Sequence, residues 1–192
     1  MSWKLPGTVL TVQERDGALA EAQFRAIFLP GGITLSQVSA ITGLESHTVQ
    51  NWVKRGFLTK PEGKRYSLRQ LCRIINIHML RGVLPLERIC GLLGYVNGQL
   101  DDESDDMIDD SDLYFMFIRL ATRSKELYRA ENRDAVLEEE LADYQEPVPG
   151  AKGRVKEVLR IMLTAWLAAR MAQETENMLT ELEKEDAYAL EQ

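Results

Sequence analysis

Two helix-start signals bracket a short segment and limit what it can fold into. Thr34 and Gln37 form a Thr-x-x-Gln pattern, and Ser67 and Gln70 form a Ser-x-x-Gln pattern. In such a capping box, the hydroxyl oxygen accepts from the backbone N–H three residues later and the side-chain oxygen of Gln accepts from the backbone N–H of the N-cap, because N–H groups at a helix start lack intrahelical acceptors. The sequence therefore predicts a helix of about two turns after Thr34 and another from Ser67 to about Leu80.

A second short helix is predicted soon after the first. Gly43 can adopt the positive φ with which helices commonly end, and Ser46 is the expected N-cap of a helix from His47 to Arg55. Val49, Trp52 and Val53 are apolar, whereas the polar residues of this helix fall on its other side by the helical period. One face of this helix can pack, and the other can contact a partner.

A basic turn follows these two helices. The segment 56–66 (GFLTKPEGKRY) contains Pro61 and Gly63 between short apolar ends, which indicates a small β wing. After the helix from Ser67, Pro85 opens a further short helix that ends near Gly94. This order of elements is that of a winged helix-turn-helix. The predicted fold class is mainly α, with the winged unit followed by an all-helical C-terminal half.

The charge of the chain is divided unevenly. The whole chain has a formal net charge of -7, with 23 Lys and Arg against 30 Asp and Glu. Residues 1–100 hold 12 of the basic residues and 6 of the acidic ones, so the remainder holds 11 and 24. Because duplex DNA is a dense polyanion, only the first part is expected to approach it. The acidic part is expected to have a different task.

Four regions are expected along the chain: an N-terminal extension, irregular and then helical over about 18–28 (1–32), the winged helix-turn-helix (33–98), an acidic linker (99–112) and a helical dimerisation or effector region (113–192). Eight of the twelve residues in 101–112 are acidic, which predicts a solvated boundary. The last helix is predicted from Arg154 to about Leu190, with an apolar stripe from Val155 to Met171. Its length of roughly 50 Å, at 1.5 Å per residue, favours pairing with a partner helix.

Four stretches together resemble the N-terminal DNA-binding domain of MerR-type regulators. They are LSQVSAITG from Leu35, TVQNWVKRGFL from Thr48, KRYSLRQL from Lys64 and LPLERICGLL from Leu84. The longer stretch TLSQVSAITGLESHTVQNWVKRGFL and the acidic run after Gly98 also resemble a bacterial family expected to bind DNA and catalogued as domain of unknown function 1836. The resemblance implies a homodimer that binds double-stranded DNA, and it implies no ligand.

The resemblance and the helical period place the same side chains at DNA. Gln50 and Asn51 carry amides that can pair with adenine through two hydrogen bonds, so they are expected to read bases. Many MerR-type regulators carry Arg and Tyr at these two positions, so the DNA target stays open. The basic side chains nearby are expected to neutralise phosphates without reading sequence. The candidate DNA-binding residues are Ser46, His47, Thr48, Gln50, Asn51, Lys54, Arg55, Lys60, Lys64, Arg65 and Tyr66.

Three kinds of function are compatible with these features. The leading prediction is a cytoplasmic, homodimeric transcriptional regulator that binds double-stranded DNA sequence-specifically. One alternative is an excisionase-like architectural factor that bends DNA, and another is a protein-interaction adaptor that keeps the fold for packing only. No enzyme, cofactor or metal site is predicted, because the sequence shows no clustered acid, base and nucleophile and no phosphate-binding glycine loop. No apolar run reaches the roughly 20 residues that span a membrane.

Overall fold

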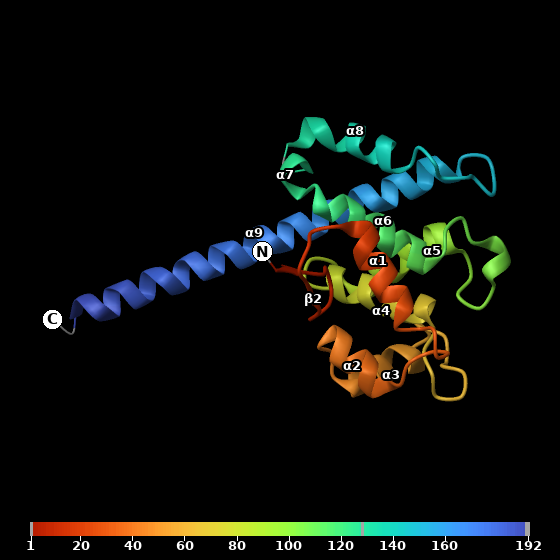
Figure 1. Ribbon diagram of the computed structural model, residues 1–192, viewed down its shortest axis with the longest axis horizontal. Helices are drawn as coiled ribbons and strands as arrows, with labels where there is room; N and C mark the ends of the chain where they lie inside the picture. The colour runs from red at the N-terminus through yellow and green to blue at the C-terminus, as the bar shows by residue number, and fades with distance from the viewer. Residues whose placement is uncertain (1, 128, 191–192) are drawn as a thin grey trace.

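The computed structural model describes residues 2–127 and 129–190 of the chain. This part is mainly helical and carries a small two-stranded sheet (Figure 1). Tyr128, Glu191 and Gln192, which belong to the predicted helical region 113–192, lie outside the described residues. Among the helices described, none is both long and apolar enough to cross a membrane.

The N-terminal segment forms a hairpin and a helix. β1 (Trp3–Lys4) pairs antiparallel with β2 (Thr11–Val12). α1 (Gly17–Ala26) begins after Asp16, whose carboxylate accepts hydrogen bonds from two backbone N–H groups of the first turn. Phe24 anchors α1 in the core. The small sheet therefore lies where the sequence predicted irregular structure, because two-residue strands leave no periodic pattern to detect.

α2 (Leu35–Thr42) and α3 (Ser46–Lys54) are joined by a tight turn. Both hydrogen bonds of the predicted capping box at Thr34 are present. Gly43 ends α2 with a φ of 74°, and a Cβ at this position would lie 2.8 Å from Cγ1 of Val9. The turn therefore needs glycine for its backbone conformation and for its close packing.

The start of α3 differs from the prediction. Its N-cap is Glu45, whose side chain makes no capping hydrogen bond. Ser46 lies in the first turn, and its Oγ is 3.0 Å from Oγ of Ser39 on α2. The prediction that Ser46 caps this helix is therefore wrong. Its hydroxyl joins the two helices instead, because the tight turn brings the first turn of α3 against α2.

α4 (Leu68–Leu80) lies at the centre of the molecule. The predicted capping box at Ser67 is present in full. The connection between α3 and α4 forms only isolated β-bridges, one of which pairs Glu62 with Arg65, so the predicted wing is a turn without extended strands. α5 (Leu86–Asn97) begins after Pro85 as predicted, but it ends one turn later than the sequence pattern indicated.

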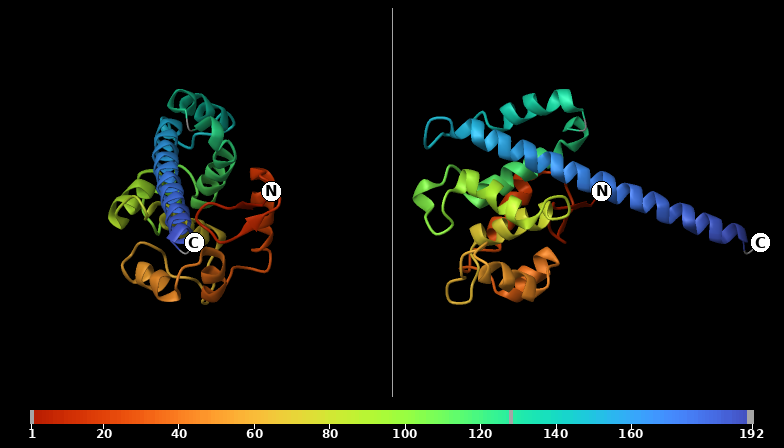
Figure 2. Two further views of the ribbon diagram at one scale, coloured as in Figure 1. Left: turned by 90° about the vertical axis from the view of Figure 1, so that its left-hand side faces the viewer. Right: turned by 180° about the vertical axis from the view of Figure 1, so that it is seen from behind.

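The remaining helices close over α4. α6 (Asp110–Thr122) packs against α1 and α4, while α9 (Ala151–Leu190) packs against α4, α5, α6 and α8 (Ala130–Glu140). A single 3-10 turn (Glu103–Asp105) and the short α7 (Ser124–Leu127) complete the chain. Figures 1 and 2 show α2 and α3 at one end of the molecule and α7 and α8 at the other. The face of α3 opposite the body therefore points away from the C-terminal helices.

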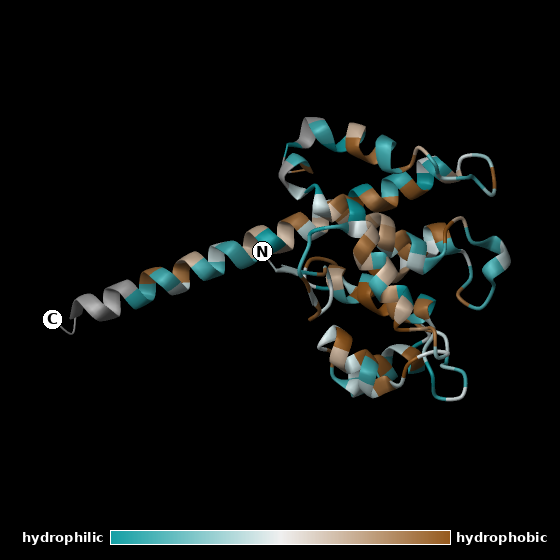
Figure 3. Ribbon diagram, in the orientation of Figure 1, coloured by the Kyte–Doolittle hydropathy of each residue, from teal (hydrophilic) through white to brown (hydrophobic). Residues whose placement is uncertain are grey.

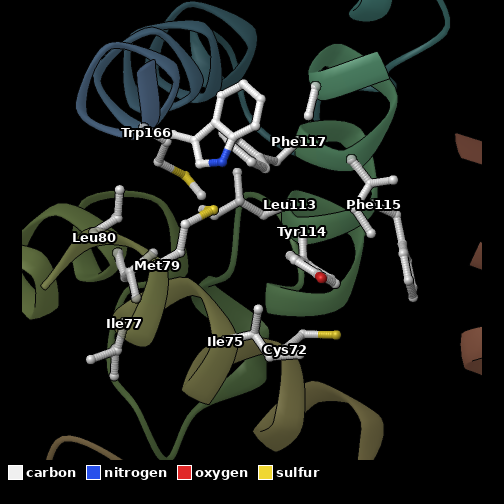
Figure 4. Packing of buried hydrophobic residues seen from close by; sticks show 14 of the residues in the cluster. Cys72, Ile75, Ile77, Met79, Leu80, Leu113, Tyr114, Phe115, Phe117 and Trp166 are labelled. Atoms are coloured by element: carbon white, nitrogen blue, oxygen red, sulfur yellow. The ribbon is translucent and has the colours of Figure 1, made fainter. Parts of the chain in front are cut away.

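One continuous hydrophobic core joins these elements. It contains buried side chains from α1, α4, α6 and α9. Figure 4 shows Met79 of α4, Phe117 of α6 and Trp166 of α9 gathered between the helices. The rings of Phe117 and Trp166 meet edge-on with centroids 5.7 Å apart. The regions 33–98 and 113–192 expected from the sequence therefore pack as one body around a shared core.

The acidic segment 99–112 is folded onto this body. Ile108 and Asp110 are buried, with exposed fractions of 5% and 1%. Carboxylates of the segment lie beside the guanidinium groups of Arg69 and Arg73 on α4. The prediction of a solvated linker is therefore wrong for the second part of the segment, because these two arginines compensate the buried charge.

α9 divides into a packed part and a projecting part. Its apolar side chains that face the body are buried up to Leu167, whereas Ile161 on the outer side is 41% exposed. Beyond that residue the helix leaves the body, and hydrophobic positions continue along the projection (Figures 1 and 3). Met171, predicted to continue the packed stripe from Val155, is 57% exposed, and Met178 and Leu182 are 65% and 55% exposed. The buried stripe thus ends where the other helices end.

Candidate nucleic-acid interface

The outer face of α3 carries polar side chains at helical spacing. Val49 and Trp52 fix the opposite face in the core, with exposed fractions of 0% and 5%. Positions three and four residues apart lie on one side of a helix, so the exposed residues form a single strip. This strip consists of His47, Gln50, Asn51 and Lys54. The structure thus brings together the two predicted base-reading amides.

Ser46 and Thr48 flank this strip and are half-buried. The hydroxyl of Ser46 is engaged with that of Ser39, so it points toward α2 as well as toward the surface. These two residues are placed beside the predicted groove contact and offer less exposed surface than the strip itself.

The turn between α3 and α4 supplies the neighbouring cations. Lys60, Lys64 and Arg65 are exposed, as the sequence predicted for phosphate contacts. Nη1 of Arg65 donates a hydrogen bond to the carbonyl oxygen of Gly32 at 3.0 Å. Nε2 of Gln70 donates to the carbonyl oxygen of Lys60 at 3.2 Å, which ties the base of this turn to α4. The cations therefore stand on a braced turn beside the exposed strip of α3.

Two predicted DNA-binding residues are engaged within the protein. Tyr66 is 3% exposed, burial raises the pKa of its phenol, and its backbone pairs with Ile33. The ring of Tyr66 therefore belongs to the core and offers almost no surface for the predicted DNA contact. Nη2 of Arg55 lies 2.7 Å from Oε1 of Glu87, and its guanidinium stacks on the ring of Phe57. To bind a phosphate, as predicted, Arg55 would have to break its ion pair with Glu87.

A groove of about 1010 Å³ separates the turn from the acidic segment. Its floor is the first part of α4. Its charged lining residues are Lys60, Glu62, Arg65, Arg69, Arg73, Asp101, Glu103 and Asp110. The groove therefore has basic side chains from the turn and from α4 on one side and carboxylates of the acidic segment on the other. The sequence patterns did not select Arg69 and Arg73, because only the packing of α4 against the acidic segment reveals their partners.

Arg73 and Asp110 form the deepest part of this arrangement. Nη1 of Arg73 lies 3.2 Å from Oδ2 of Asp110, and its Nε donates to the carbonyl oxygen of Phe57 at 3.1 Å. Nδ2 of Asn76 donates to the carbonyl oxygen of Asp110. Burial raises the pKa of Asp110, while Arg73 and then Arg69 act in the opposite direction. This network connects α4 to α6 and to the segment that follows α3.

Two comparisons with known proteins find similarity to parts of the chain. Residues 33–117 match the family described as "Domain of unknown function (DUF1836)". The chain is also similar to "Uncharacterized protein YkrK" of Bacillus subtilis (strain 168), with 32% identity over 80 residues, which are 40% of this chain and 34% of the relative. The similarity thus spans about a third of that relative's length. No solved structure matches the chain.

The region that matches the family spans several consecutive elements and ends within α6. It includes α2 to α5, the acidic segment and the first two turns of α6. The family match covers that part of the chain, and the similarity to the Bacillus relative also supports the resemblance to this family. The matched region crosses position 98, where the sequence predicted the end of a domain, and it contains both partners of the Arg73–Asp110 ion pair.

Proposed function

We propose that this protein is a sequence-specific, double-stranded DNA-binding transcriptional regulator that acts as a homodimer. In this proposal α2, α3 and the basic turn are a MerR-like winged helix-turn-helix. α3 lies in the major groove, which is about 12 Å wide, and the basic turn contacts the flanking backbone. Base recognition by Gln50 and Asn51 then supplies specificity, and the cations supply affinity.

The observation that carries this proposal is the exposed strip of α3. Within the described residues, no hydrogen bond or ion pair occupies the side chains of Gln50 and Asn51. The strip lies on a helix whose other face is packed in the core, so the backbone positions that carry these side chains are fixed. Exposed amides can pair with base edges, and the cations on the neighbouring turn can contact phosphates, so together they match the surface of duplex DNA.

The homodimer is supported by the projecting part of α9. Most of the stability of a helix in a protein comes from packing of its apolar face, so the projecting part gains stability when a partner covers its apolar stripe. The exposed residues of α9 that follow a three–four spacing begin on its packed part with Ile161 and Thr164 and continue along the projection with Ala168, Met171, Thr175, Met178 and Leu182. This spacing is typical of a helix that pairs with a like helix, and a second copy of the chain carries the same stripe.

Selection of duplexes from a random DNA pool by the full-length protein tests the proposal. Asn51→Ala is expected to lose about 1–3 kcal/mol of discrimination at the base that Asn51 contacts. Arg65→Ala is expected to weaken binding to all duplexes alike and to reduce the slope of log affinity against log salt by about 1. Gln23→Ala, which removes an exposed amide from α1, is the matched control and should change neither property.

The outcome also separates the alternatives. Enrichment of two related half-sites supports the dimeric regulator. A failure to enrich any sequence, with weak binding that is indifferent to Asn51→Ala and Arg65→Ala, contradicts the proposal. That result would favour the protein-interaction adaptor, for which the carboxylate side of the groove beside the basic turn is the specific supporting feature.

A further inference from the structure

Arg69 stands beside the cations proposed to contact phosphate. It lies in the first turn of α4 and lines the same groove as Lys60 and Arg65. Its neighbour Gln70 holds the base of the basic turn through the carbonyl oxygen of Lys60. Arg69 therefore has the charge and the location of a further backbone contact, yet the sequence patterns did not select it.

The acidic segment surrounds the Arg69 guanidinium with carboxylates. Nη2 lies 2.7 Å from Oδ2 of Asp106, Nη1 lies 3.2 Å from Oε1 of Glu103, and Nε lies 3.6 Å from Oδ2 of Asp109. The Arg69 side chain is consequently only 17% exposed. A nucleic-acid phosphate also offers oxygen acceptors to a guanidinium, so the segment and a phosphate would use the same N–H donors.

The acidic segment is attached to the rest of the molecule differently before and after Met107. From Met107 onward it is anchored, because the backbone N–H of Met107 donates to Val96 and Asn97 donates to the carbonyl oxygen of Ile108. Before Met107 the described ion pairs to the rest of the body are those to Arg69, while Asp105 folds back on the start of the segment and accepts a hydrogen bond from the backbone N–H of Gln99. The first part of the segment can therefore leave α4 while the second part stays in place.

The carboxylates of Glu103 and Asp106, which pair with Arg69, differ in their surroundings. The Glu103 side chain is 79% exposed, so its attraction to Arg69 is weakened by solvent. Burial raises the pKa of Asp106 to about 6 in spite of Arg69, and its Oδ1 is buried without a hydrogen-bond partner. Asp109 and Asp110 lie close enough to disfavour its charge further. A charged Asp106 is thus costly to keep in this position.

We infer that the acidic segment competes with the DNA backbone for Arg69, so that Arg69 is a further phosphate-binding residue that the protein itself masks. The contact is autoinhibitory: DNA must displace Glu103 and Asp106 to reach the guanidinium. The inference rests on the proposed function, and it adds a residue and a means of setting affinity that do not depend on base recognition.

A double-mutant cycle on the full-length protein tests the competition. Glu103→Gln with Asp106→Asn is expected to bind the selected duplex about tenfold more tightly, the gain of one charge-assisted contact. The salt slope should steepen by about 0.9, as for one more phosphate. Arg69→Gln alone should change affinity little, because Arg69 is masked. Arg69→Gln added to the unmasked variant should abolish the gain.

A matched variant separates unmasking from general repulsion. Asp101→Asn with Asp102→Asn removes two carboxylates from the same segment, and neither pairs with Arg69 among the described ion pairs. It should give a smaller gain that persists when Arg69→Gln is added. Thermal unfolding of each variant shows whether it is folded.

The outcomes of this cycle distinguish a failure of the inference about Arg69 from a failure of the proposed function. A gain that requires Arg69 supports the inference. No gain from Glu103→Gln with Asp106→Asn, or a gain that survives Arg69→Gln, overturns it while leaving the proposed function intact. If neither the wild type nor any variant binds a duplex, the proposed function fails and the inference fails with it.

Discussion

Arg73 and Asp110 form a buried ion pair between α4 and α6, and breaking it from one side is expected to be costly. The Arg73 side chain is 8% exposed and that of Asp110 is 1% exposed. Arg73→Met removes the contact of 3.2 Å to Asp110 and leaves the carbonyl oxygen of Phe57 without the Arg73 donor. Truncating one partner of a buried pair typically costs about 3–5 kcal/mol, because the other charge stays buried.

The loss should depend on pH in a defined direction. In Arg73→Met the remaining cation near Asp110 is Arg69, whose Nε is 3.9 Å from its carboxylate. The folded-state pKa of Asp110, already raised by burial, should rise further. A carboxyl whose pKa is raised by folding stabilises the folded state at low pH, and that contribution is lost as pH rises through its folded-state pKa. Arg73→Met should therefore be less destabilised at acidic pH than at pH 7.

Urea unfolding followed by circular dichroism measures the cost. Arg73→Met combined with Asp110→Leu should recover much of the stability, since no unpaired charge remains buried. Arg88→Met, which removes an exposed arginine from α5, is the matched control and should change stability by less than about 0.5 kcal/mol. The reasoning is refuted if Arg73→Met costs less than about 1 kcal/mol or if the double variant loses the sum of the two single losses.

Three further predictions concern other parts of the molecule. If the exposed stripe of α9 forms the proposed dimer interface, Met178→Lys with Leu182→Lys should give a monomeric mass in sedimentation, whereas Gln173→Lys, on another side of α9, should keep the mass of the wild type. The same mass for all three proteins would refute this interface. Tyr66→Ala should cost about 3 kcal/mol in unfolding without altering the salt slope of DNA binding, and a changed slope would contradict its core role. Folding raises the pKa of Asp106 from 3.8 to about 6, so its contribution to stability is lost as pH rises through 6. Asp106→Asn should thus gain stability relative to wild type between pH 4 and 7 in thermal unfolding; a difference that does not vary with pH would rule this out.

The local features of the fold could be predicted from the sequence. The capping boxes at Thr34 and Ser67 and the glycine that ends α2 depend on contacts within a few residues, so their signals lie in short patterns. The helical period likewise placed Gln50 and Asn51 opposite the buried Trp52. Such features are determined by the chain segment that contains them.

Features that depend on distant segments were decided by the tertiary structure alone. Arg73 and Asp110 are 37 residues apart, and only the packing of α6 on α4 makes them partners. The same packing turns part of an apparently solvated acidic run into a cover for Arg69. The ring of Tyr66 is buried by elements that its own segment does not encode. A charge or ring acquires its energetic role from its surroundings, and those surroundings exist only once the chain has folded.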